Sequence, residues 1–167
     1  SPEYVGYVTK IFRRLIDAYY NNEEMNVTNM ELTNLKKLYN RDFTLGHLFK
    51  ERNYKLMNIK SSNHIGTHLG KATLYKNKIK IELDDDIYQY DGIRFSQQGG
   101  MIVNYLYDEN FLLINHASKN SIVYVDNKIS LTSSCEVLKT LDKHLMDTIK
   151  DIPKRKIPVN ITVDAYI

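Results

Sequence analysis

The spacing of apolar residues changes near residue 54, and this change limits the folds open to the chain. Before it, apolar residues recur at the three- and four-residue intervals of helices. After it, they alternate with polar residues as in β-strands. The connections after residue 54 are short and rich in Asn, Asp and Gly, so they cannot hold the crossover helices that parallel strands need. We therefore expect an α+β protein with N-terminal helices, a mostly antiparallel sheet of about six to eight strands, one C-terminal helix and a last strand.

Helix-start signals place the N-terminal helices. Ser1-Pro2-Glu3 offers a capping serine, a first-turn proline and an early acid, and predicts a helix over 2–21. Thr28 and Glu31 form a capping-box pattern before a second helix over 29–40. A short third helix is expected over 44–52. In the first helix we expect the buried face to contain Val5, Val8, Phe12, Leu15, Ile16 and Tyr19.

The alternating region predicts a series of short strands joined by hairpin turns. Ile79, Ile81 and Leu83 alternate with charged residues, which indicates a strand with one buried face. A second capping-box pattern at Ser133 and Glu136 predicts a helix over 135–150, and a final strand is expected over 159–165. The other expected strands cover 71–76, 87–90, 93–96, 101–107, 111–115, 121–125 and 128–132.

Length and composition suggest how the chain is organised and where it works. Its 167 residues suit one domain, or a helical part over 1–53 and a sheet part with its packed helix over 54–167. The single cysteine, Cys135, cannot form an intramolecular disulfide or a zinc site of several cysteines, which favours an intracellular setting. No apolar run approaches the roughly 20 residues that cross a bilayer, so we expect no membrane partner.

The common catalytic and cofactor motifs are missing from the sequence. The stretch from His64 to Gly70 has neither the register of a dinucleotide loop nor the Lys-Ser/Thr of a phosphate loop. His64 and His68 are four residues apart, but the glycines between and after them indicate a loop and not a metal-binding helix. We therefore expect no cofactor, no metal site and no catalytic residue.

Aromatic and charged residues of the sheet region suggest a binding surface. Aromatic side chains two apart on a strand can stack on bases, and carboxylates can accept the hydrogen bonds of a cationic base such as 7-methylguanine. Basic side chains could then hold its phosphates. The candidate ligand-binding residues are Tyr88, Tyr90, Phe95, Tyr105 and Tyr107 for stacking, Asp84, Asp85, Asp86 and Asp91 for the base, and Lys71 and Arg94 for phosphate.

The stretch from Gly70-Lys71 through Asp84-Asp85-Asp86 to Tyr88-Gln89-Tyr90 resembles, in architecture and composition, the cap-binding region of the polymerases of segmented negative-strand RNA viruses. This resemblance implies a non-catalytic module that binds the 7-methylguanosine cap of mRNA for cap-snatching. Its partners would be capped RNA or a nucleotide and the remainder of a larger RNA polymerase chain. Its location would be the host cytoplasm.

Two other functions remain open from the residues. The first is a protein-interaction domain without a small-molecule ligand, in which the tyrosines pack and the helix faces carry the partner. The second is a metal-dependent nuclease in which Asp84, Asp85 and Asp86 hold a magnesium or manganese ion. We expect a binding role more than an enzymatic one for this chain.

Overall fold

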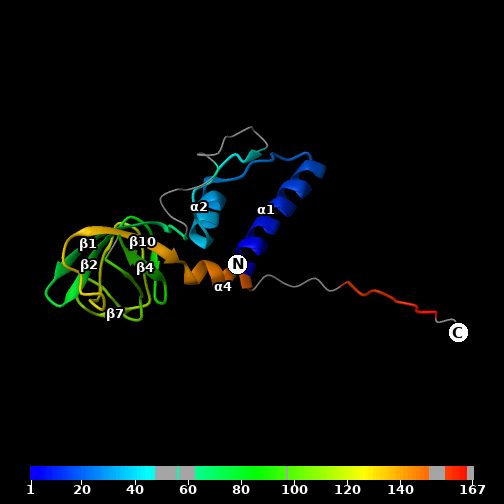
Figure 1. Ribbon diagram of the computed structural model, residues 1–167. Coiled ribbons are helices and arrows are strands. Elements are labelled where there is room, and N and C mark those ends of the chain that lie inside the picture. The colour runs from blue at the N-terminus through cyan, green and yellow to red at the C-terminus, as the bar shows by residue number, and fades with distance from the viewer. Residues whose placement is uncertain (48–55, 57–62, 97, 151–156, 165–167) are drawn as a thin grey trace.

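The computed structural model describes residues 1–47, 56, 63–96, 98–150 and 157–164, and its class is α+β as expected. Figure 1 shows a group of helices beside a curled sheet, with β10 running into the helix that leads back to the N-terminal helices. The helices are α1 (Pro2–Tyr20), α2 (Asn29–Leu38) and α4 (Lys143–Lys150).

The first two helices begin where the sequence predicts. The side chain of Ser1 accepts a hydrogen bond from the Tyr4 amide, which caps α1. The side chain of Thr28 accepts from the Glu31 amide, and the Glu31 carboxylate accepts from the Thr28 amide, so the capping box of α2 is complete. The helix expected over 44–52 falls mostly outside the described residues.

The three helices share a small apolar cluster that is separate from the core of the sheet. Tyr7 and Ile11 of α1 meet Ile149 of α4, with Leu15, Leu35, Leu38 and Leu145 packed around them. The buried face expected for α1 is therefore largely wrong. Val5, Phe12, Ile16 and Tyr19 are exposed, because α1 is apolar around much of its circumference and its neighbours cover the adjacent face.

The curled sheet has eight strands in the order β5-β4-β10-β1-β2-β9-β6-β7, and β3 and β8 form a separate pair. Every pairing is antiparallel, as the short connections require. The strands are β1 (Thr67–Tyr75), β2 (Lys78–Leu83), β3 (Ile87–Tyr88), β4 (Gly92–Phe95), β5 (Gly100–Ile102), β6 (Leu106–Tyr107), β7 (Leu113–Ile114), β8 (His116–Ala117), β9 (Ile122–Asp126) and β10 (Cys135–Leu141).

Alternate side chains of these strands fill the inside of the curl. On β2 the inward residues Ile79, Ile81 and Leu83 are buried, as their alternation with charged residues predicts. Other strands add side chains that are likewise inaccessible, so one continuous core lies within the sheet. Its further members include Leu69, Ala72, Ile87, Ile93, Phe95, Val103, Leu106, Val123, Val125 and Val137.

The expected helix over 135–150 is wrong in its first half. Residues 135–141 form β10, which pairs with both β1 and β4, and only 143–150 are helical. Cys135, Val137 and Lys139 are the alternate residues that point inward, and Lys139 is fully buried. A charged residue at an inward position conceals the two-residue period, and Leu138, Leu141 and Leu145 then mimic a helical stripe.

Three further expectations about strands need correction. No strand forms over 128–132, where Asn127 caps a turn by accepting from the Leu131 amide. The strand expected over 101–107 is divided between β5 and β6. The part of 159–165 that the structure describes, 159–164, is exposed and has no strand partner. Among the described helices, none has the length and apolar character needed to cross a membrane.

Candidate functional site

The three consecutive acids after β2 do not form a common site. Asp84 lies 2.8 Å from His68 Nε2, and Asp85 lies 2.6 Å from Lys37 Nζ on α2. The Asp86 carboxylate accepts a hydrogen bond from the Lys119 amide. In the part of the chain that the structure describes, no group of three or more His, Cys, Asp or Glu side chains is arranged to hold a metal ion.

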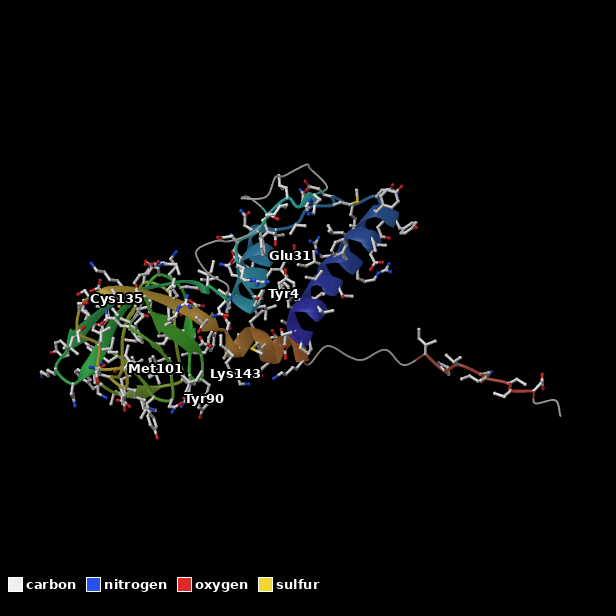
Figure 2. All side chains as sticks on the ribbon, viewed as in Figure 1. Tyr4, Glu31, Tyr90, Met101, Cys135 and Lys143 are labelled. Atoms are coloured by element: carbon white, nitrogen blue, oxygen red, sulfur yellow. The ribbon has the colours of Figure 1, made fainter. Side chains whose placement is uncertain are left out.

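The fourth candidate acid, Asp91, belongs to a buried ionic network. Lys139 Nζ lies 3.2 Å from both Asp91 and Asp142, and it donates to the Asp86 carbonyl at 2.7 Å. Asp91 also accepts from the backbone amides of Tyr88 and Lys143. These contacts tie the turn before β4 to the junction of β10 and α4, where Figure 2 shows Lys143.

Burial and charge act in opposite directions on this network. Burial favours a neutral lysine, but the carboxylates of Asp91 and Asp142 outweigh it and raise the pKa of Lys139. Burial also favours a neutral Asp142, yet Lys139 and the Leu145 amide hold the pKa of Asp142 below its usual value. Burial is the larger influence at Asp91 and raises its pKa. The network therefore has a structural role, and Asp91 is inaccessible to a ligand.

The candidate stacking residues are dispersed. Tyr88 is already sandwiched, with ring centroids 4.3 Å from His116 and 4.5 Å from His144. Tyr107 lies under Lys78, whose Nζ is 3.8 Å from the ring centroid. Phe95 is 0% exposed in the sheet core.

The two remaining stacking candidates and Lys71 are exposed. Tyr90 and Tyr105 are 52% and 50% exposed. Lys71 is exposed on β1, where its register partners are Glu82 and Glu136. Arg94 lines an open hollow on the sheet.

This hollow, called the β4–β5 cleft below, has a volume of about 550 Å³. It opens where β4, β5 and the end of β10 meet the segment that precedes β1. Met101 of β5, labelled in Figure 2, marks its position on the sheet. The lining residues are Asn63, His64, Gly92, Ile93, Arg94, Gly100, Met101, Ile102, Thr140 and Leu141.

Two glycines keep the floor of the β4–β5 cleft free of side chains. Gly92 pairs with Ile102 and Gly100 pairs with Arg94, so both glycines lie on the same face of β4 and β5 as Arg94. A Cβ at Gly92 would approach Leu141 Cβ to 2.9 Å, and one at Gly100 would approach the Ile93 carbonyl oxygen to 3.0 Å. The absence of these side chains therefore permits the close packing of β4 against β10 and of β5 against β4.

Arg94 supplies the positive charge of the cleft. Its guanidinium donates to the carbonyls of Ile65 at 2.6 Å and His64 at 3.3 Å. These two contacts hold the guanidinium in place and leave some of its five N–H donors unused. No ion pair joins Arg94 to a carboxylate among the residues that the structure describes.

His64 forms part of the cleft wall as a neutral side chain. Its Nδ1 accepts the Asn40 amide at 2.8 Å, so the ring proton is on Nε2. That Nε2 is buried and has no hydrogen-bond partner. Burial lowers the pKa of His64, and the charge of Arg94 acts in the same direction, against the backbone contact with Asn40. The ring stacks on Tyr39 at 5.6 Å, which fixes the wall to the end of α2.

The cleft therefore combines hydrogen-bond donors with an apolar side. Arg94 contributes N–H groups, while Ile102 and Leu141 contribute apolar surface. The side chain of Met101 packs against the core on the other face of β5. This arrangement is typical of a binding site, in which a few polar groups orient a ligand against apolar walls.

Sequence reasoning found one of these residues and missed the others. Arg94 was named as a phosphate ligand, whereas His64 was considered only as a metal ligand paired with His68. The two histidines do not meet at one site, since His68 lies on β1 between Asp84 and Glu136. The glycines of the short connections predict turns, but Gly100 is the first residue of β5 and Gly92 the first of β4.

Comparisons with known proteins give two matches and one negative result. Residues 1–58, about a third of the chain, match the sequence model of peptidase family U32. A crystal structure of the C-terminal domain of a protein assigned as a U32 peptidase of Geobacillus thermoleovorans aligns with a TM-score of 0.40 and 15% identity. That alignment covers 44% of this chain and 91% of the other. No curated protein sequence matches.

The interpretation as a viral cap-binding module is wrong. The family matched by residues 1–58 is a peptidase family, and not a family of viral polymerases or of cap-snatching proteins. The resemblance rested on composition and architecture, which many α+β proteins share. The interaction domain and the nuclease fit these matches no better. Neither comparison tests the partners expected from the sequence.

Proposed function

We propose that this chain is a domain of a U32 peptidase-family protein and that its β4–β5 cleft binds a segment of polypeptide. The match over residues 1–58 supports the family. The name of that family supports a polypeptide as the material bound. The helical part within 1–53 would then be the portion shared with the family, and the sheet part within 54–167 would carry the binding site. The single cysteine favours an intracellular setting.

The position of the cleft along an edge strand is the observation that carries the proposal. β5 is the first strand of the sheet and pairs with β4 alone among the described strands. An edge strand offers unpaired backbone groups to which an extended peptide can add as a further strand. The cleft lies on this same strand, so a peptide that pairs with β5 would pass beside it.

The lining of the cleft suits an extended chain. At Gly92 and Gly100, which line the cleft, no side chain projects from β4 or β5. Ile102, which is 47% exposed on β5, presents apolar surface to its side chains. In such complexes the main chain supplies affinity and the pockets beside the strand supply selectivity.

An NMR titration tests this function. The ¹⁵N-labelled chain would be titrated with reduced, carboxymethylated α-lactalbumin, a soluble unfolded polypeptide. We expect the largest amide shifts at Gly92, Gly100 and Ile102. Shifts confined to β7 or α1, or no binding at all, would contradict the proposal.

Two variants locate the binding surface. Ile102→Ala removes an exposed apolar side chain from β5 and should weaken binding, with unchanged amide shifts in β4 and β10 as the check on folding. Leu113→Ala changes an exposed residue on β7, the opposite edge of the sheet, and should leave binding unchanged. Equal loss with both variants would place the polypeptide elsewhere.

A further inference from the structure

The charge of Arg94 is unmatched, and this distinguishes it from the other cations near the junction of sheet and helices. Lys139 is fully buried between two carboxylates, and Lys37 lies 2.6 Å from Asp85. Arg94 is half-buried, yet in the described ranges its hydrogen-bond partners are the two carbonyls of His64 and Ile65. A guanidinium forms its strongest hydrogen bonds with anions, and its planar fork binds carboxylate or phosphate through two parallel bonds. On a polypeptide this anion is a carboxylate.

Among the residues that the structure describes, the wall beside Arg94 carries no negative charge, since no aspartate or glutamate lines the cleft. His64 Nδ1 is occupied by the Asn40 amide, and the buried Nε2 carries a proton that has no acceptor. A ligand group placed beside Arg94 is therefore favoured if it carries oxygen acceptors and negative charge.

The rest of the lining indicates what the carboxylate is attached to. Ile102 and Leu141 provide apolar surface on the same side of the sheet as Arg94. In a polypeptide whose backbone runs along β5, an apolar last residue carries a carboxylate and an apolar side chain on the same Cα atom. An internal aspartate or glutamate carries its carboxylate on the side chain, so the apolar group beside it must come from another residue.

We infer that the β4–β5 cleft selects the free C-terminal carboxylate of a polypeptide whose last residue is apolar. Arg94 binds the carboxylate, and Ile102 and Leu141 contact the last side chain. This inference rests on the proposed polypeptide-binding function and specifies its ligand.

Matched peptides test the inference by isothermal titration calorimetry on the intact chain. Acetyl-Gly-Val-Leu with a free carboxylate should bind at least about tenfold more tightly than its C-terminal amide, because one charge-assisted contact is lost. Acetyl-Gly-Glu-Leu amide, with an internal carboxylate, should bind no better than the first amide. N-acetyl-leucine carries the same carboxylate without a chain and should bind more weakly than the peptide acid.

Two substitutions at one exposed position separate charge from folding. Ile102→Glu brings a negative charge to the cleft and should reduce binding of the peptide acid by about tenfold or more. Ile102→Lys changes size and polarity to a similar extent but should retain the preference for acid over amide. Arg94→Gln should abolish the preference for acid over amide. If Arg94→Gln does not fold, the comparison of Ile102→Glu with Ile102→Lys still tests the inference.

Each outcome bears on a different statement. Equal affinity for acid and amide, or equal effects of Ile102→Glu and Ile102→Lys, would overturn the selection of a carboxylate and leave the polypeptide-binding function standing. N-acetyl-leucine binding as tightly as the peptide would show a site for small carboxylates and overturn the inference. Failure of the peptide acid while unfolded α-lactalbumin still binds at Gly100 would also overturn it. Failure of both ligands would refute the proposed function itself.

Discussion

Lys139 Nζ on β10 lies 3.2 Å from Asp91 Oδ2, and both side chains are inaccessible to solvent. Asp91 also accepts from the Lys143 amide at 2.8 Å, at the start of α4. Asp142 completes the contact on the other side of the ammonium group. This pairing holds the turn before β4 against the strand that leads into the helices, and so it fixes the end of the sheet where the cleft opens.

Removal of Lys139 should destabilise the chain strongly. Lys139→Met keeps the apolar stem but leaves Asp91 and Asp142 buried without a cation. Breaking a buried pair in this way costs about 3–5 kcal/mol. We expect a loss of that size in the free energy of unfolding, measured by urea denaturation at pH 7.

The double variant Lys139→Met/Asp91→Asn supplies the control for this prediction. It removes a buried carboxylate along with the ammonium group and should regain part of the lost stability. A single variant that unfolds at the same urea concentration as the parent would show that the pair does not support the fold.

Gly70 should tolerate no side chain. It lies at the irregular step in the β1–β10 register with φ of +153°, and an added Cβ would collide with the Glu82 carbonyl oxygen on β2. Gly70→Ala should therefore separate β1 from β2 and prevent normal folding, which thermal denaturation by circular dichroism would detect. Gly46→Ala is the matched control, because Gly46 has φ of +63° and nothing within 4 Å of its Cβ position. We expect Gly46→Ala to cost about 1 kcal/mol, and similar losses in both variants would contradict the steric argument.

The pKa values of His64 and His68 should be shifted in opposite directions from that of a free histidine. The carboxylates of Asp84 and Glu136 flank His68 at 2.8 and 2.7 Å and raise its pKa. Burial, aided by Arg94, lowers the pKa of His64. NMR titration of the ring protons should give a midpoint above about 6.5 for His68 and below it for His64. Reversed midpoints would contradict the described contacts.

The raised pKa of His68 also predicts a pH-dependent stability difference. Protonated His68 is favoured in the folded chain, so its contribution is fully present below the unfolded pKa of about 6.5 and is lost as the pH rises through the folded pKa. Because the side chain is about half exposed, we expect less than about 1 kcal/mol. The difference in unfolding free energy between the parent and His68→Gln should thus be larger at pH 6 than at pH 9. A difference that grows with pH would refute the assignment.

The capping box of α2 should contribute measurably to stability. Thr28→Ala removes the acceptor for the Glu31 amide and should cost about 1 kcal/mol in urea denaturation. Thr33→Ala is the control, because the Thr33 hydroxyl donates only to the Asn29 carbonyl one turn earlier. Equal or greater loss from Thr33→Ala would show that the cap is not the source of the stability.

Helix caps and regular alternation could be predicted from the sequence because they are local. Ser1, Thr28 and Glu31 satisfy backbone donors within one turn, so α1 and α2 begin where expected. Ile79, Ile81 and Leu83 show the two-residue period of β2 without interruption. The α+β class followed from these local signals together with the short connections.

Features that depend on distant partners could not be predicted in the same way. Lys139 is an inward residue of β10 only because Asp91 and Asp142 neutralise it, and the sequence does not show that pairing. The face of α1 that is buried depends on the position of α4, which supplies Ile149 to the cluster of Tyr7 and Ile11. Helical spacing alone could not show whether the side of α1 with Tyr7 and Ile11 or the side with Phe12 and Ile16 would be buried.

The candidate site combines residues that lie far apart in the sequence. Arg94 was recognised as a basic residue, but its fixed orientation comes from carbonyls about 30 positions earlier, at His64 and Ile65. Gly92 and Gly100 form one floor because β4 and β5 pair in a particular register. Charge and residue type could therefore indicate Arg94, while the cleft itself required the tertiary structure.

The most direct test of the account is an isotope-filtered NOE measurement on the labelled chain with unlabelled acetyl-Gly-Val-Leu. The account predicts NOEs between the leucine methyl groups of the peptide and the side chain of Ile102. NOEs to the exposed methyl groups of Val5 and Ile16 on α1, with none to Ile102, would contradict it.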